Sequence, residues 1–259
     1  MLTKIAVALL ATVAVAQDKP MLEPADADII DIDIKPYYKK IYAYCKMQHN
    51  PAYPTTNPFG AFKLSQNGPW ANIDIFGFMK QLPPPNPSRH GFAIARSYWF
   101  GDDCRNAGSH WNPTSETHGA QEASPSHVGD LKPIYDDFLG NASSYSTSAS
   151  RPTFYGTQSV LGKAMIVYEG KDDEGLGCTD ESYWNGTVGR EIACCNIRRV
   201  YILSPVELEY AEAEKTDLGR GLSEEFGGEV DIMSEDQFRE LFDGMWDDLD
   251  EIDDLFDQN

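Results

Sequence analysis

The sequence predicts an all-β domain, a sandwich or a barrel, because short apolar runs rich in β-formers alternate with turn signals. Proline-rich residues 83–87 and Gly/Asn turns separate these runs, and no long internal repeat is visible. The expected strands fall within residues 41–45, 59–64, 70–78, 91–97, 159–169 and 191–203. The chain of 259 residues therefore predicts one β domain, residues 39–204, with an extension at each end.

Residues 1–16 are typical of a secretory signal peptide. Lys4 precedes the apolar run 5–15, and Ala14-Val15-Ala16 offers a cleavage site before Gln17. A membrane anchor is the alternative, but the run is too short to span a bilayer comfortably. The sequence therefore predicts a secreted, extracellular protein with no membrane partner.

Residues 17–38 form an acidic leader. From Asp26 to Ile34 acidic and apolar residues alternate, which suits an extended arm added to a sheet edge. A solvated leader fits the same composition equally well.

Residues 205–259 form an acidic tail. They contain twenty Asp and Glu against three Lys and Arg, a net of −17 out of −20 for the chain. This charge disfavours nucleic acid and anionic membranes as partners and favours divalent cations. Carboxylate oxygens can bind calcium, but no EF-hand loop is present, so the binding we expect is weak and involves multiple sites. A solvated acidic face with no specific calcium role is the alternative.

Within this tail, residues 234–256 predict an amphipathic helix. Ser234 and Gln237 form a capping box, and a heptad-like apolar seam follows. The seam consists of Phe238, Phe242, Met245, Leu249, Ile252 and Phe256. It predicts either a helix packed on its own domain or a homo-oligomer through this helix, which calcium would strengthen by screening the acidic face.

Three of the five histidines lie in one Gly/Pro-rich stretch that no helix could hold: His110, His118 and His127, followed by Asp130. Three imidazoles and one carboxylate make a closed shell of the kind that tetrahedral zinc requires. The stretch therefore predicts one zinc ion per chain, bound on a long loop.

The chain resembles the copper/zinc superoxide dismutases from about residue 39 to 203. The matching motifs, in the family's order, are His90-Gly-Phe, Phe100-Gly-Asp, the Cys104–His110 spacing, Gly108-x-His-x-Asn-Pro, His127-Val-Gly-Asp-Leu and Asp172-Asp173. The resemblance implies a Greek-key β fold and zinc ligation by His110, His118, His127 and Asp130. It also implies that Asp172 steadies a zinc-ligand imidazole, His118, from the outer shell, and that Cys104 and Cys194 form a disulfide.

The departures from this family bear on activity. Ala93, Ala95 and Tyr168 stand at positions of copper-ligand histidines, and Glu191, next to Arg190, stands at the position of the active-site arginine. Only His110, the bridging ligand, remains from the copper set, and one imidazole cannot hold copper in a nitrogen-rich site. We therefore expect no copper and no catalytic residues.

The combination of a secreted dismutase-like domain, lost copper ligands and acidic extensions is closest in character to bivalve haemolymph and extrapallial proteins of the cavortin, dominin and pernin type. This resemblance implies an extracellular, non-enzymatic metal-binding protein. The alternatives are a calcium-binding shell-matrix protein and a weakly active dismutase.

Five cysteines in a secreted chain imply disulfides with one thiol left over. Cys194 and Cys195 are neighbours on an expected strand, so their side chains should point to opposite faces. A second bridge between Cys178 and Cys195 would leave Cys45 as a buried thiol, and an intermolecular bond remains open. Two glycosylation sequons, at Asn141 and Asn185, agree with secretion.

Overall fold

The computed structural model describes residues 40–53, 57–84, 88–203 and 230–243. All of them belong to one compact unit, Tyr37–Asn259. The predicted signal peptide, the acidic leader and helix residues 244–256 lie outside the described residues. No helix in the described ranges is long and apolar enough to cross a membrane.

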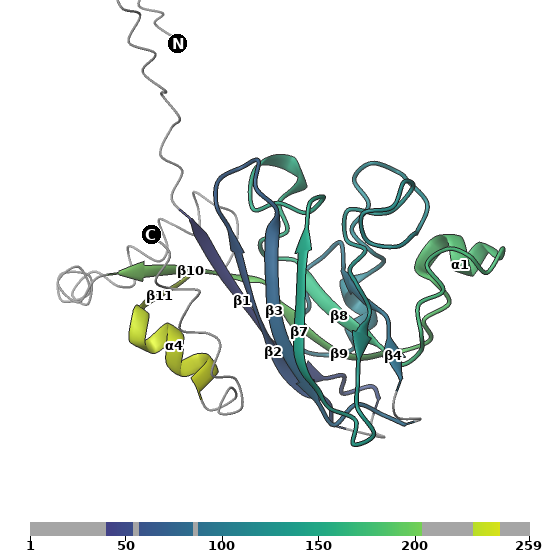
Figure 1. Ribbon diagram of the computed structural model, residues 1–259, viewed down its shortest axis with the longest axis horizontal. Helices are drawn as coiled ribbons and strands as arrows, with labels where there is room; N and C mark the ends of the chain where they lie inside the picture. The colour runs from purple at the N-terminus through teal and green to yellow at the C-terminus, as the bar shows by residue number, and fades with distance from the viewer. Residues whose placement is uncertain (1–39, 54–56, 85–87, 204–229, 244–259) are drawn as a thin grey trace, which may run out of the picture. The chain divides into compact units, whose positions relative to one another are not determined.

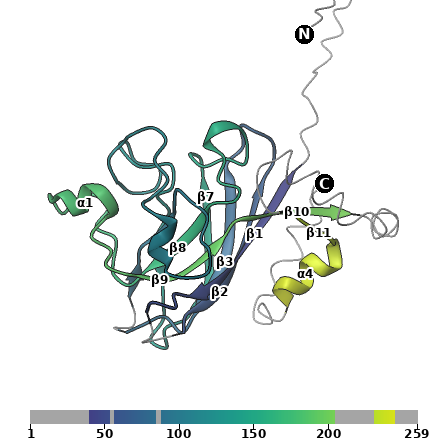
Figure 2. The ribbon, with the colours of Figure 1, turned by 180° about the vertical axis from the view of Figure 1, so that it is seen from behind.

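Nine strands of the described chain form one sheet that curls into a half-barrel (Figures 1 and 2). Its main path runs β5 (Phe92–Ile94), β8 (Ala164–Tyr168), β9 (Glu191–Asn196), β1 (Ile41–His49), β2 (Phe59–Gln66), β3 (Ile73–Lys80) and β7 (Ala142–Ala149). Strand β10 (Arg198–Leu203) pairs with β1, and β11 (Val230–Ser234) pairs with β10 in parallel. Short strands β4 (Arg89–His90) and β6 (Ile134–Tyr135) form a separate ladder. The prediction of an all-β, dismutase-type fold is confirmed.

Alternating apolar residues of these strands build the interior of the half-barrel. Three aromatic rings meet there, with centroids 4.8 Å apart for Phe62 and Phe92, 5.2 Å for Phe92 and Tyr145, and 5.6 Å for Phe62 and Tyr145. Tilted and edge-on contacts of this kind are the favoured geometries of aromatic pairs. Gly77 lies opposite Phe62 in the β2–β3 register. A β-carbon at Gly77 would come 2.1 Å from the Phe62 ring, so this strand position requires glycine.

Short helices shape the loops around the sheet. The 3-10 turns η1 (Cys104–Ala107) and η2 (Gly156–Gln158) lie in connections between strands. Helix α1 (Asp180–Asn185), between β8 and β9, begins where Thr179 accepts a hydrogen bond from the backbone N–H of Ser182. It ends at Gly186, whose left-handed conformation is the usual stop signal for a helix.

Helix α4 (Glu235–Asp243) begins at the predicted capping box. The Ser234 hydroxyl accepts from the Gln237 N–H at 3.0 Å, and the Gln237 amide oxygen accepts from the Ser234 N–H at 2.9 Å. The first two seam residues, Phe238 and Phe242, are buried against Ala61, Phe78 and Val200 of the sheet. This part of the seam therefore packs on its own domain.

Two disulfides cross-link the domain, one between strands β1 and β9 and one between the turn η1 and β9. The predicted Cys104–Cys194 bond is confirmed, and a second bond joins Cys45 to Cys195, with a Cα–Cα separation of 5.4 Å. The alternative pairing of Cys178 with Cys195 is wrong, because Cys178 is an exposed free thiol on a loop. Cys45 and Cys195 instead face the same buried core from the paired strands β1 and β9. Cys194 joins a different apolar cluster, as expected for neighbours on opposite faces of a strand.

Replacing Cys45 and Cys195 together with Ala should lower the free energy of unfolding by about 2–5 kcal/mol, because the bond closes a long loop in the unfolded chain. The two residues are 150 positions apart in the sequence. Urea titration under non-reducing conditions measures the difference. The control, Cys178→Ala, should change stability by less than about 0.5 kcal/mol, since that thiol is exposed. Equal stability of the double variant and the unaltered protein would contradict the prediction.

Candidate metal centre

The four predicted ligands lie on the long connection between β5 and β6, which is anchored to the edge of β5. His110 forms a β-bridge with Ala95, and Asp130 forms one with Ala93. The His118 N–H donates to the Tyr183 carbonyl at 2.9 Å, which ties the middle of the connection to α1. Backbone contacts at both ends and in the middle thus bring residues twenty positions apart to one place.

The side chains of His110, His118, His127 and Asp130 converge in a buried cluster, with candidate ligand atoms all within 4.8 Å of one another. The Asp130 Oδ1 atom lies 2.8, 3.0 and 3.2 Å from the Nδ1 atoms of His110, His118 and His127, respectively. The other carboxylate oxygen, Oδ2, accepts from the backbone N–H of His127 and of Gly119. All three imidazoles therefore present the same ring nitrogen to one point.

This arrangement fits a small tetrahedral cation. The Nδ1 atoms of His118 and His127 are buried and make no hydrogen bond with any described group, although each points at Asp130. Donor atoms around tetrahedral zinc, at bonds of about 2.0–2.1 Å, lie about 3.3 Å apart. The observed separations from Asp130 Oδ1 are close to that spacing. The cluster could thus hold a metal such as zinc.

The electrostatics of the cluster also favour a positive charge at its centre. Burial opposes ionisation of Asp130, but the contacts with three histidines outweigh it and hold the pKa of this carboxyl well below its usual range. Burial likewise acts to lower the pKa of His118, yet contacts with Asp130 and Asp172 raise it to about 9. Burial lowers the pKa of His110. The carboxylates of Asp130 and Asp172, which lie on two sides of His118, therefore stabilise positive charge at this imidazole.

The structure places Asp172 against the far side of His118, where the resemblance put it. Its Oδ1 atom lies 2.8 Å from His118 Nε2 and accepts a hydrogen bond from the Glu174 N–H. A β-carbon at Gly186 would come 2.1 Å from Asp172 Oδ1 and 2.6 Å from His118 Nε2. The glycine that ends α1 is thus also what lets this helix approach the cluster, a constraint that sequence reasoning missed.

The residues that the resemblance places at the family's copper-ligand positions lie beside this cluster, buried among apolar side chains. Ala93, Ala95 and Tyr168 are buried together with Ile166 and Val188. The Tyr168 ring faces His110 with centroids 5.6 Å apart, and His110 Nε2 is buried without a hydrogen bond among the described groups. Burial, together with the charges of nearby carboxylates, raises the pKa of Tyr168 far above its usual value, so the phenol is neutral.

Arg190, the cationic residue next to Glu191, contacts Glu169 and Tyr53 instead of the metal cluster. Arg190 pairs with Glu169 at 3.2 Å and lies over the Tyr53 ring, 4.3 Å from its centroid. Glu191 itself is half-buried, and burial raises the pKa of its carboxyl. An acid paired in register with Tyr168 therefore occupies the position at which the resemblance expects the family's arginine.

Sequence reasoning left His90 without a role, and the structure gives it one. Its Nδ1 lies 3.0 Å from the Tyr168 carbonyl oxygen, while its Nε2 lies 3.8 Å from Asp136 Oδ2. This buried side chain thus links β4 to the end of β8. The signal for it was the His90-Gly-Phe motif.

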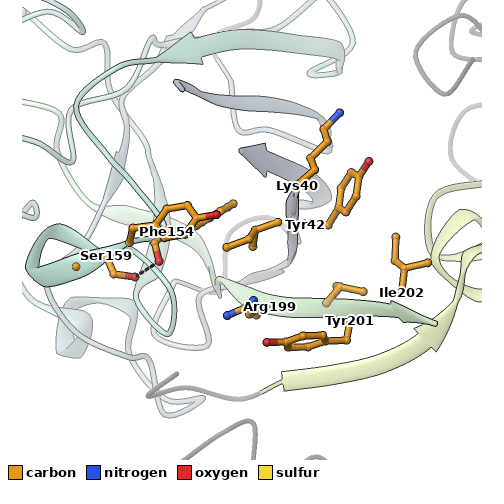
Figure 3. A pocket seen from close by; sticks show the side chains of 11 residues that line it. Lys40, Tyr42, Phe154, Ser159, Arg199, Tyr201 and Ile202 are labelled. Atoms are coloured by element: carbon orange, nitrogen blue, oxygen red, sulfur yellow. Dashed lines mark hydrogen bonds between the residues drawn. The ribbon is translucent and has the colours of Figure 1, made fainter. Parts of the chain in front are cut away.

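A separate groove of about 730 Å³ lies where β1 and β10 begin to pair (Figure 3). Its lining includes Lys40, Phe154 and Arg199, and the Arg199 guanidinium lies 4.4 Å from the centre of the Tyr201 ring. None of the lining residues belongs to the metal cluster. We assign no ligand to this groove.

Comparison with known proteins identifies the family. Residues 59–197 match the family described as copper/zinc superoxide dismutase, and the chain belongs to this family. It is 36% identical to the extracellular Cu-Zn superoxide dismutase of Caenorhabditis elegans over 145 residues, or 56% of this chain and 63% of that protein. It is 42% identical to the Cu-Zn enzyme of Cordyceps militaris over 113 residues, 42% of this chain and 70% of that one. The match thus spans less than two thirds of the nematode relative.

Proposed function

We propose that this protein is a secreted, zinc-binding member of the family that neither holds copper nor dismutates superoxide. The observation that carries the proposal is the contrast between two neighbouring sites. The cluster around Asp130 is buried and offers four ligands, whereas Ala93, Ala95 and Tyr168, which the resemblance places at copper-ligand positions, are buried among apolar side chains. His110, His118, His127 and Asp130 would hold the zinc ion, which supplies a fixed charge that cross-links the long loop.

The chemistry of dismutation supports the absence of activity. The reaction needs a metal that cycles between two oxidation states, and zinc has no redox chemistry. It also benefits from positive steering of the superoxide anion. Here the net charge is −20, and Glu191 occupies the arginine position. The proposed protein thus lacks a redox-active metal, and its charge repels the superoxide anion.

Secretion is supported by three independent features. Residues 1–16 have the pattern of a signal peptide. The two disulfides suit an oxidising compartment, and the nematode relative is named as an extracellular enzyme. The combination matches the bivalve haemolymph and extrapallial proteins in character, and we propose a similar extracellular metal-binding role.

The acidic tail supports a second, compatible role in calcium-dependent self-assembly, as in a mineral-associated matrix. Its twenty acidic and three basic residues attract divalent cations. Phe238 and Phe242 pack on the domain, so the self-association we propose uses the later seam residues Met245, Leu249, Ile252 and Phe256. These lie outside the described residues.

The purified full-length protein should carry about one zinc and no stoichiometric copper per chain, measured by inductively coupled plasma mass spectrometry. His118→Ala should abolish stoichiometric zinc, because it removes one ligand and the partner of Asp172. Asp172→Asn should weaken zinc binding about 10–100-fold while leaving all four ligands in place. The control is His49→Ala, an exposed histidine on β1. One equivalent of copper after mild purification would overturn the proposal.

The combined variant Ala93→His, Ala95→His and Tyr168→His should gain copper but show only feeble dismutation, since Glu191 and the net charge oppose the anion. Each introduced imidazole at a buried alanine should cost about 1–3 kcal/mol of stability through overpacking. Adding Glu191→Arg to this variant should raise its activity in a superoxide assay. Dismutation by the unaltered protein at rates typical of the family would contradict the non-enzymatic reading.

The variant Leu249→Asp with Ile252→Asp should form smaller particles than the unaltered protein, because it breaks the apolar seam without removing an acidic residue. Sedimentation velocity should show larger species in calcium than in chelator for the unaltered protein but not for this seam variant. Point variants are preferable to truncation after Gly228, which would also uncover Ala61, Phe78 and Val200. As a control, Asp248→Asn with Asp254→Asn should keep the assembly and lose part of its calcium response. Unchanged particle size in the seam variant would refute assembly through this helix.

A further inference from the structure

Large exposed apolar side chains gather next to the two glycosylation sequons. The structure exposes nine such side chains among the described residues, and six of them lie within the ten residues before Asn141 or Asn185. These six are Tyr135, Phe138, Leu139, Leu176, Tyr183 and Trp184. Exposed apolar residues scattered singly are ordinary, but contiguous ones indicate a surface that something covers.

The first patch lies on and before helix α1, which lies between β8 and β9 in the sequence and at the right of Figure 1. Trp184 directly precedes Asn185 and is 66% exposed, and Tyr183 beside it is 45% exposed. Asn185 is the last residue of the helix and Gly186 turns the chain away from it. The asparagine and the two aromatic rings therefore share one exposed turn.

The second patch lies on a tight turn that Asp137 holds together. Its Oδ1 atom accepts from the backbone N–H of Leu139 at 2.8 Å and of Asn141 at 2.9 Å. The Asp137 N–H also donates to the Asn141 carbonyl. This closed turn presents Phe138 and Leu139 outward, 81% and 79% exposed, within three residues of Asn141.

We propose that Asn141 and Asn185 are both N-glycosylated and that each glycan covers the apolar patch beside it. The apolar faces of sugar rings can lie on aromatic and aliphatic side chains, while their hydroxyl groups remain in water, and glycans are bulky and solubilising. A covalent attachment point beside each patch favours this occupant over a free partner. The chain's other Asn-x-Thr triplet, at Asn112, has proline at its second position and is not an acceptor.

The attachment chemistry is consistent with the geometry at Asn185. The amide oxygen of Asn185 accepts from the Thr187 N–H at 3.2 Å, and this contact does not use Nδ2, the atom that carries the sugar. In the transfer, a bond forms between Nδ2 and the anomeric carbon of a polyprenyl-pyrophosphate-linked oligosaccharide. The bond from that carbon to the pyrophosphate oxygen breaks, the pyrophosphate leaves, and a base takes the amide proton.

This inference rests on the secretion part of the proposed function, because the sugar donor is found in the secretory pathway, but not on zinc or on activity. The full chain with its own N-terminus should be produced in cultured eukaryotic cells and collected from the medium. Peptide mapping after enzymatic release of glycans in heavy-oxygen water should show both asparagines converted to labelled Asp. Asn141→Gln and Asn185→Gln should each remove one glycan, whereas Asn112→Gln should remove none.

Hydroxyl-radical footprinting tests the covering of the patches. Oxidation of Trp184 and of Phe138 should rise several-fold when the folded protein is deglycosylated. Trp70, which is 82% exposed and has no sequon nearby, should react equally in both forms. Circular dichroism should show the same fold before and after deglycosylation.

Each result separates the claims. A secreted chain with both asparagines unmodified overturns the inference and leaves secretion standing. A chain retained in the cytosol with its first sixteen residues attached overturns secretion as well. Glycans present without any change at Trp184 and Phe138 overturn the covering role.

Discussion

The structure of the loop region depends on one carboxylate, that of Asp130. One of its oxygens lies within 3.2 Å of three imidazole nitrogens, and the other accepts two backbone N–H groups. The connection from β5 to β6 covers residues 95–133 with only the single turn η1 as regular structure. Loops of such length are uncommon unless they serve a site, and ordering them costs conformational entropy. The contacts of the buried Asp130 carboxylate with three histidines can offset that cost. A cation bound between these four side chains would offset more of it, because each side chain would then bind the cation.

His110 marks the border between two chemical environments. Its Nδ1 atom faces Asp130, its Nε2 atom is buried without a hydrogen bond among the described groups, and its ring contacts that of Tyr168 in an apolar cluster. Backbone pairing holds the site on both sides of this border, since Ala95 forms a β-bridge with His110 and Ala93 forms one with Asp130. These bridges join backbone groups, so they do not require a particular side chain at position 93 or 95. This is why family membership establishes the fold, while function must be argued from the residues at each site.

Local patterns were enough to predict most of the central strands, the metal cluster and the start of α4, but not the polar strand β7 (Ala142–Ala149), which has no apolar run. Three histidines in one Gly/Pro-rich stretch predict a metal site, and Ser234 followed by Gln237 predicts a helix start, because each signal lies within one short segment of the sequence. The Cys45–Cys195 bond was not predictable in this way, because it depends on the register of strands 150 residues apart. The close approach of Gly186 to His118 and the outward course of Arg190 likewise arise from tertiary packing.

Strand β11 and helix α4 show how tertiary contacts divide the acidic tail. Residues 230–234 show only weak alternation of apolar and polar residues, yet they form a strand parallel to β10. Asp231 holds this strand, since it accepts a hydrogen bond from the Tyr44 hydroxyl at 2.8 Å and forms an ion pair with Arg198 at 3.0 Å. Phe238 and Phe242 then cover the sheet at Ala61, Phe78 and Val200. One acid of the tail thus neutralises a cation of the domain, and the start of the apolar seam stabilises the outer face of β2 and β3. Because the first-turn carboxylates of α4, Glu235 and Asp236, are exposed, their charge does not oppose the packing of this helix.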